Sequence, residues 1–339
     1  MSETPVPATS TSEPALSPTP TIPAPEEMPA PSPPPATETA APPQPGATPV
    51  APAATSTGPA KEEPQNALTE QFTGYEWKAL TEFRKGIPDA LSKAYDDKPD
   101  AKTTPINLWG VKIDPTDLDS DARVSVVLMK FLRARNLNVS AATDMFVATL
   151  RWRSEFNVEA AMKEEFPADV FGQLGHIHGR DKGGRPVVYN IYGGNQDLEA
   201  VFGDVDRFLR WRVAFMEKSL EMLDFTTVDQ AIQVHDYAGV SMSSRTPASK
   251  SAASQASGIF GSHYPELLYK KFFVNVPGFM TWLFWFFKTI IPSATFAKMA
   301  VVGSGPKSIG KALLPFIDAD QLPKRYGGDA DAKVFETKE

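Results

Sequence analysis

Three polar side chains share one face of a β-strand in the stretch QAIQVHDY, residues 230–237. Side chains of an extended segment alternate between two faces, so Gln233, His235 and Tyr237 point one way while Ile232 and Val234 point the other. A sheet face that carries carboxamide, imidazole and phenol groups is unusual for a plain apolar core. The pattern favours a ligand-binding face, and ordinary hydrogen-bonded burial of the same groups is the alternative.

A single arginine lies within the apolar face of a long predicted helix, Asp204 to Phe225. Arg212 comes four residues after Phe208 and four before Met216, whereas Arg210 lies on the polar side and is expected to be solvated. A buried guanidinium is costly unless it meets an anion. The anion is either an internal carboxylate or the carboxylate or phosphate of a ligand.

Two other motifs suggest chemistry but lack essential parts. The run GSGPKSIGK fits most of a phosphate-binding loop, but Ala312 follows it where a magnesium-binding hydroxyl is needed, and Pro306 removes one N–H. His176 and His178 fall on one face of an extended segment, with no third metal ligand nearby. We interpret the first as a chance resemblance and the second as a surface strand.

Composition narrows the possible functions further. The 339 residues contain no cysteine, which excludes disulfides, thiolate metal sites and cysteine nucleophiles. The first 65 residues hold seven Glu and one Lys, a charge of −6, so the remainder carries about −1 of the total of −7. A nearly neutral folded part is not expected to bind nucleic acid.

The predicted elements that position these residues fall into three regions. Residues 1–65 are rich in Pro and Ala and contain no aromatic residue, which predicts a disordered tail. Residues 66–165 show helical periodicity, including two helices joined near Asn136 to Asn138, with Ser140 as the N-cap of the second. Residues 166–335 alternate short β-rich runs with helices and predict an α/β lobe with a mixed, largely parallel sheet.

An aromatic segment, PGFMTWLFWFFKTIIP, stands out in this lobe. A membrane span requires about 20 apolar residues, and this run is bounded by Pro277 and Pro292 and interrupted by Lys288. The N-terminal residues do not resemble a signal peptide. The expectation is therefore a cytoplasmic protein, with this segment either lying in a membrane interface or forming a buried core helix.

Several motifs in order resemble the CRAL-TRIO lipid-transfer family from about residue 70 to residue 330. They are MKFLRARNLNVSAATDMF, GRPVVYNIYGG, HDYAGVSM, HYPELLYKKFFVNVPGF, PSATFAKMAVV and LPKRYGG. More narrowly, the chain looks like the fungal non-classical phosphatidylinositol transfer proteins whose members also bind haem. The resemblance implies a helical lobe, an α/β lobe whose sheet floors an apolar cavity, and a gating helix at the aromatic segment.

The resemblance also implies two sets of site residues. Binding of the phosphatidylinositol headgroup would fall to Arg135, Glu266 and Lys298. Binding of ferric haem b would use Tyr237 as axial ligand with His235 beside it, and the pocket would be completed by Tyr192, Arg212 and Lys271.

We therefore expect a phosphatidylinositol carrier without catalytic turnover, which also binds haem. It would act in the cytoplasm and associate peripherally with endoplasmic reticulum or microsomal membranes. The alternatives are a lipid carrier without haem, a scaffold that acts through the Pro-rich tail, and an enzyme, for which no complete catalytic constellation stands out.

Overall fold

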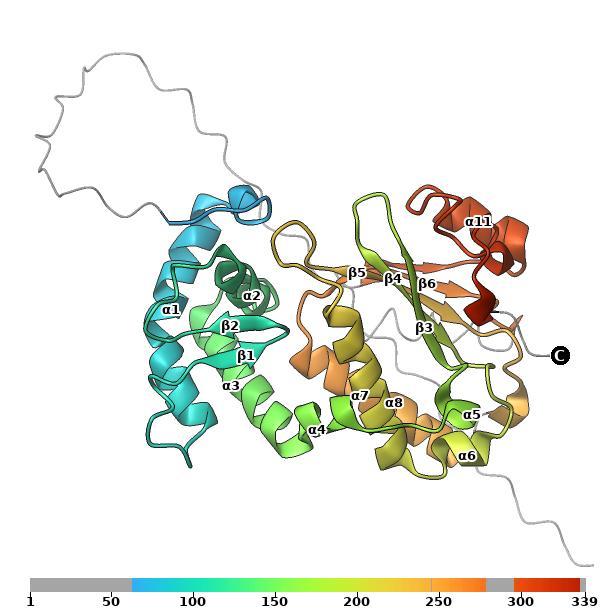
Figure 1. Cartoon of the computed structure of the whole chain (residues 1–339), viewed down its shortest axis with the longest axis horizontal. Helices are drawn as coiled ribbons and strands as arrows, with labels where there is room; N and C mark the ends of the chain where they lie inside the picture. Colours follow the sequence, from blue (N-terminus) through green and yellow to red (C-terminus); the bar gives the residue numbers. More distant parts are fainter. Residues whose placement is uncertain (1–62, 245, 279–295, 336–339) are drawn as a thin grey trace, which may run out of the picture. The chain divides into compact units, whose positions relative to one another are not determined.

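The computed structural model of the chain describes residues 63–244, 246–278 and 296–335 (Figure 1). Most of the tail, and the aromatic segment from residue 279 onward, lie outside these ranges. The disorder of the tail and the assignment of the aromatic segment as a gating helix therefore stay predictions. None of the helices in the described ranges is both long and apolar enough to cross a membrane.

The first part of the described chain is a helical lobe with one β-hairpin (Figure 1). Its elements are η1 (Thr69–Gln71), α1 (Gly74–Ala94), β1 (Ile106–Leu108), β2 (Val111–Ile113), α2 (Ala122–Arg133), α3 (Val139–Phe156) and α4 (Val158–Lys163). The prediction of a helical lobe is confirmed, but it missed the hairpin. The hairpin turns at Trp109 and Gly110, which both have positive φ, as a two-residue hairpin turn of type I′ requires.

The starts of the three long helices of this lobe, α1, α2 and α3, are fixed by local side chains. Thr73 and Glu76 form a reciprocal capping box at the start of α1, and Asp121 caps α2. Asn138 caps α3 by accepting the Ala141 N–H, so the prediction of Ser140 as the cap is wrong. Asn and Ser are both good caps, and the chain enters the helix two residues earlier than predicted.

The second part is a five-stranded sheet in the order β3-β4-β5-β6-β7, in which β3 is antiparallel to β4 and the other neighbours are parallel. Its strands are β3 (Gly175–Arg180), β4 (Pro186–Ile191), β5 (Ala231–Asp236), β6 (Leu268–Val274) and β7 (Met299–Val301). The predicted mixed, largely parallel sheet is confirmed. His176 and His178 lie on β3, where both rings pack edge-on against Phe335.

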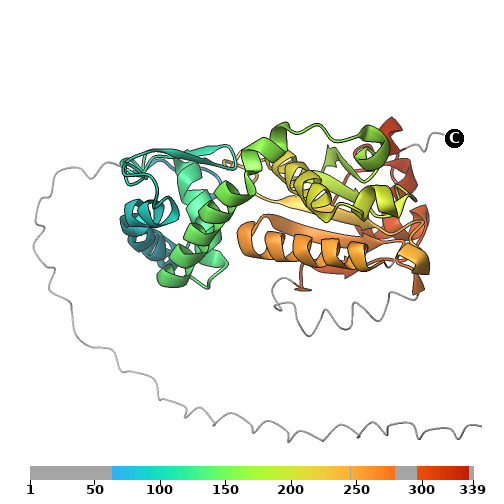
Figure 2. The same cartoon turned by 90° about the horizontal axis from the view of Figure 1, so that it is seen from below.

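Helices cover both faces of the sheet (Figure 2). On one side lie α5 (Ala168–Phe171), α6 (Leu198–Phe202), α7 (Val205–Leu220) and α8 (Pro247–His263); on the other, α11 (Pro306–Leu313) packs its buried face against β4, β5 and β6. Short 3₁₀ turns complete the lobe: η2 (Met242–Ser244), η4 (Lys324–Tyr326) and η5 (Lys333–Phe335). The segment that resembles a phosphate-binding loop leads into α11, and there the Gly305 N–H donates to Asn275 Oδ1.

The predicted helix from Asp204 to Phe225 is α7, with Asp204 as its N-cap. It ends at Leu220, and the turn that follows is held by the Asp224 carboxylate, which accepts the N–H groups of Thr226, Thr227 and Val228. Arg212 is buried on this helix, as predicted. Arg210 is not fully solvated, because its Nε donates to Glu164 Oε2 at 2.5 Å.

Candidate functional site

The register of the parallel strands places polar side chains on one face of the sheet, which we call the ligand face. Asn190 pairs with His235 across β4 and β5, and Gln233 pairs with Lys271 across β5 and β6. Residues directly opposite on neighbouring strands share a face. The ligand face therefore carries Asn190, Gln233, His235, Lys271 and Phe273, whereas Ile232 and Val234 belong to the core on the α11 side. The predicted alternation along β5 is confirmed.

A hydrogen-bonded chain of side chains crosses the ligand face. The Tyr192 hydroxyl lies 2.7 Å from His235 Nδ1, and His235 Nε2 lies 3.2 Å from Gln233 Oε1. Because a carboxamide oxygen only accepts, Nε2 carries the imidazole proton and Nδ1 accepts from Tyr192. Burial, followed by the charges of Lys271 and Arg212, holds the pKa of His235 well below its usual range. His235 is therefore neutral, and both of its nitrogens are engaged.

Tyr237 lies beside these hydrogen-bonded side chains but is not bonded to any of them. Its ring centroid is 4.8 Å from that of Tyr192 and 6.4 Å from that of Phe273. Its hydroxyl makes no hydrogen bond within the described ranges, and burial raises the pKa of Tyr237 well above its ordinary value. The phenol is thus protonated and has a free oxygen, which is available to a ligand or a metal.

Two cations face the same region without a carboxylate partner in the described residues. Arg212 is 7% exposed, its guanidinium lies 4.8 Å from the Phe260 ring centroid, and its Nη1 is buried without a hydrogen bond. Burial, and then the charge of Arg212, lowers the pKa of Lys271 to about 8. The internal carboxylate considered for Arg212 is not found in the described part of the chain. Two unneutralised cations favour an anionic ligand.

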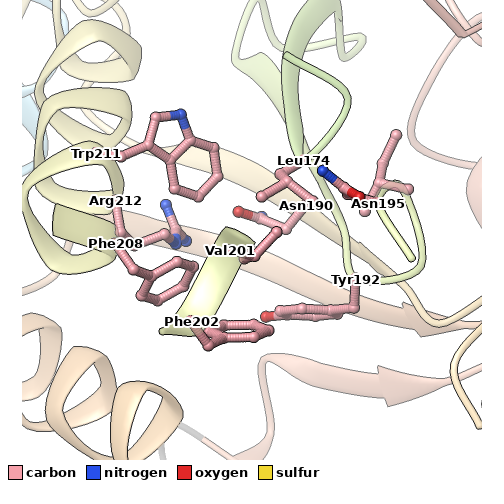
Figure 3. Close-up of a pocket in the computed structure, with 10 residues that line it drawn as sticks. Leu174, Asn190, Tyr192, Asn195, Val201, Phe202, Phe208, Trp211 and Arg212 are labelled. Carbon is pink, nitrogen blue, oxygen red and sulfur yellow. The ribbon is translucent and has the colours of Figure 1, made fainter. Parts of the chain in front are cut away.

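A small cavity opens between the ligand face and the helices α6 and α7 (Figure 3). Its volume is about 30 Å³. It is lined by Leu174, Asn190, Ile191, Tyr192, Asn195, Val201, Phe202, Phe208, Trp211 and Arg212. A space of this size holds about one water-sized group, so neither a porphyrin nor an acyl chain enters it whole.

The three headgroup candidates are only partly assembled. Lys298 Nζ donates to Glu266 Oε2 at 2.8 Å, and each side chain is about one-third exposed (29% and 33%). Glu266 has a φ of 52°, in the left-handed region. Arg135 follows α2, and its Nη1 donates to the Ala134 carbonyl rather than to either of the other two. The structure therefore pairs Glu266 with Lys298 and gives Arg135 no contact with them.

Comparison with known proteins assigns the chain to a family. The profile of the CRAL/TRIO N-terminal domain matches residues 79–148, and that of the CRAL/TRIO domain matches residues 171–328. A relative called phosphatidylinositol transfer protein sfh5, from Aspergillus terreus, is 34% identical over 304 residues, which is 84% of this chain and 68% of that protein. The chain belongs to the CRAL/TRIO family.

Two further comparisons agree with this CRAL/TRIO assignment. Phosphatidylinositol transfer protein sfh5 of Aspergillus oryzae is 37% identical over 266 residues, which is 74% of this chain and 55% of that protein, so the CRAL/TRIO chain spans little more than half of its length. The crystal structure of Sfh5 superposes with a TM-score of 0.65 at 27% identity, covering 76% of this chain and 88% of that one. The predicted boundary between residues 165 and 166 stays a prediction.

Two buried polar residues of this CRAL/TRIO chain were missed by the sequence analysis. Asn190 is 3% exposed and neither atom of its amide has a hydrogen-bond partner within the described residues. Lys130 is 2% exposed, and its Nζ donates to Asp229 Oδ2 at 2.7 Å and to the Glu266 carbonyl at 3.1 Å. Lys130 thereby joins the helical lobe to the backbone of a headgroup candidate. A polar residue inside an otherwise apolar run was the available signal in each case.

Proposed function

We propose that this CRAL/TRIO chain is a phosphatidylinositol carrier without catalytic turnover. The similarity to relatives that are called phosphatidylinositol transfer proteins is the observation that carries the proposal. The partly exposed pair of Glu266 and Lys298 supports it, because an ammonium group on a partly exposed surface can leave a carboxylate for the phosphate of a lipid headgroup. Exchange of a lipid requires contact with a membrane, so we also propose peripheral association with membrane surfaces.

Replacing Lys298 tests the headgroup assignment. A hydrogen bond to a charged group contributes about 1.5–3 kcal/mol, so Lys298→Ala is expected to lower phosphatidylinositol transfer between vesicles by about tenfold or more. The matched control is Lys324→Ala, because Lys324 also pairs with a carboxylate, that of Asp331, but lies far more exposed, at 66%. Equal transfer by Lys298→Ala and the wild type would rule out the assignment.

We further propose that the ligand face binds ferric haem through Tyr237. Within the described residues, the groups present fit such a ligand: the Tyr237 hydroxyl makes no hydrogen bond, His235 is neutral and bonded to Tyr192, and Arg212 and Lys271 have no carboxylate partner. Bound haem would supply a hard ferric centre, which suits a phenolate donor, and two propionates. Tyr237 would hold the iron, and Arg212 and Lys271 would neutralise the propionates.

The low pKa of Lys271 predicts how the affinity for an anionic ligand depends on pH. Lys271 is charged below about pH 8 and loses its proton above it. The affinity for iron-free protoporphyrin, which carries two carboxylates and no metal, should be constant below that pH. Above it, the affinity should fall by up to about tenfold per pH unit, because binding the anion must then also take up a proton.

The groups around Lys271 do not titrate in the same range. The pKa of His235 lies well below its usual value and those of Tyr192 and Tyr237 lie above theirs, while Arg212 stays charged. The control is Lys271→Met, which should bind protoporphyrin more weakly and show no change in affinity between pH 7 and pH 9. A wild-type affinity that stays constant across this range would contradict the role of Lys271.

A further inference from the structure

Asn190 and Arg212 are buried side chains with unsatisfied polar atoms. Asn190 is 3% exposed and makes no hydrogen bond through either amide atom, and Nη1 of Arg212, which is 7% exposed, also has no partner within the described residues. Folded proteins rarely leave such groups unpaired, because each buried unsatisfied group costs free energy. Two such side chains in one place indicate a third group that accepts a hydrogen bond from each of them.

Both side chains line the same small cavity, Asn190 from β4 and Arg212 from α7. Figure 3 shows the carboxamide of Asn190 and the guanidinium of Arg212 turned toward one another across it. Most of the remaining lining is aliphatic or aromatic, from Leu174, Ile191, Val201, Phe202, Phe208 and Trp211. Tyr192 and Asn195 also line the cavity, but the Tyr192 hydroxyl is paired with His235 Nδ1 and the Asn195 amide donates to the carbonyls of Asp169 and Val170. Within the described residues, the unpaired polar atoms of the lining are therefore those of Asn190 and Arg212.

The donors in the cavity define the chemistry of the missing group. A guanidinium only donates hydrogen bonds, and the NH₂ of a carboxamide also donates, so Arg212 Nη1 and Asn190 Nδ2 can each donate to one oxygen of a carboxylate, whereas Asn190 Oδ1 needs a donor from elsewhere. The volume of about 30 Å³ admits one small group and not the body of a ligand. A water molecule would fill this space but leave the guanidinium charge without a counter-charge.

We propose that Asn190 and Arg212 form a subsite that binds one carboxylate group of an otherwise apolar ligand. The inference rests on the proposed ligand face and extends it with Asn190, a residue to which the sequence assigned no role. Such a carboxylate has two sources: a propionate of a porphyrin, or the head of a free long-chain fatty acid. In both cases the apolar part of the ligand would lie outside the cavity.

Pairs of ligands that differ only in the carboxylate test this proposal. The full-length chain is titrated with protoporphyrin and its dimethyl ester, and with palmitic acid and methyl palmitate, and binding is followed by tryptophan fluorescence, to which Trp211 in the cavity wall contributes. We expect the wild type to prefer at least one acid over its ester by about tenfold or more, as for a charge-assisted hydrogen bond. The iron-free porphyrin keeps this result independent of Tyr237.

Substitutions of Asn190 assign the preference to the subsite. Asn190→Leu replaces the carboxamide by an apolar side chain of similar size and should reduce the preference for the acid to a few-fold. Asn190→Asp should abolish it, because the new carboxylate pairs with Arg212 and repels that of the ligand, while binding of the ester persists. Tyr189→Phe is the control, because its hydroxyl is also buried and unpartnered but lies on the opposite face of the sheet, stacked on Tyr326.

The outcomes separate this proposal from the proposed function. A preference for palmitic acid alone identifies fatty acids as the source, and a preference for protoporphyrin alone identifies propionates; both support the subsite. Equal binding of acid and ester by the wild type overturns it, as does an unchanged preference in a folded Asn190→Leu or Asn190→Asp variant. The tests of the proposed function are independent of the comparison of acids with esters. Lys298→Ala can still lose phosphatidylinositol transfer, and Tyr237→Phe can still lose haem, whether or not the subsite exists.

Discussion

Replacing Tyr237 by phenylalanine is expected to remove ferric haem from the protein. The substitution deletes one oxygen and keeps the ring that packs near Tyr192 and Phe273, so the fold should be retained. Loss of a group that merely orients a metal ligand costs about 10–100-fold in affinity, and loss of the ligand itself should cost at least as much. Protein purified from haem-replete cells should therefore contain about tenfold less haem than the wild type, or none.

We expect Tyr237, and not His235, to bind the iron because the two side chains differ in their hydrogen bonds. His235 uses Nδ1 for Tyr192 and Nε2 for Gln233, whereas the Tyr237 oxygen has no hydrogen bond within the described residues. Burial raises the pKa of Tyr237, so the phenol stays protonated until a cation such as ferric iron stabilises the phenolate. Tyr237 can therefore bind the iron without breaking a hydrogen bond to a described residue, whereas His235 cannot.

Two further variants identify the source of any change in the spectrum. Tyr189→Phe removes a hydroxyl from the opposite face of the sheet and should leave the haem content unchanged. Tyr192→Phe removes the hydrogen bond to His235 Nδ1 and should shift the absorption spectrum without loss of most of the haem. An unchanged ferric spectrum and haem content in Tyr237→Phe would exclude it as the ligand, and His235 would be the next residue to replace.

The parts of the site that depend on local periodicity could be predicted from the sequence. The face shared by Gln233 and His235 follows from alternation along one strand, and the burial of Arg212 follows from its place in the apolar stripe of one helix. Neither requires knowledge of distant segments. The α/β class follows in the same way from strands that alternate with helices.

The parts that depend on tertiary contacts could not be predicted. The strand PVVYNI reads as a continuous apolar run, and only the packing of α7 over it places Asn190 opposite Arg212. The hydrogen bond between the Tyr192 hydroxyl and His235 Nδ1 depends on the register of β4 against β5. Family resemblance grouped Arg135 with Glu266 and Lys298, but only the latter two are in contact.

The carboxylate of Asp236 holds the end of β5 to the C-terminal segment. It is fully buried, and it accepts hydrogen bonds from Asn275 Nδ2 at 2.7 Å, the Tyr326 hydroxyl at 2.9 Å, Arg325 Nη2 at 3.0 Å and the Ala238 N–H at 2.9 Å. These donors come from the turn after β5, the loop after β6 and the segment around η4. One carboxylate thus joins three segments that are distant in sequence on the face opposite to His235.

Asp236→Ala is therefore expected to cause the largest loss of stability among the changes considered. The Arg325 side chain is 32% exposed and can be solvated, but the substitution also leaves the Tyr326 hydroxyl and the Asn275 amide without their acceptor. Together these losses should cost about 3–5 kcal/mol. The free energy of unfolding in urea should fall by that amount, and the melting temperature by on the order of 10 °C. The control is Asp331→Ala, whose ion pair with Lys324 is 3.8 Å long and exposed, and which should cost less than about 1 kcal/mol. Similar losses in the two variants would show that Asp236 does not hold these segments together.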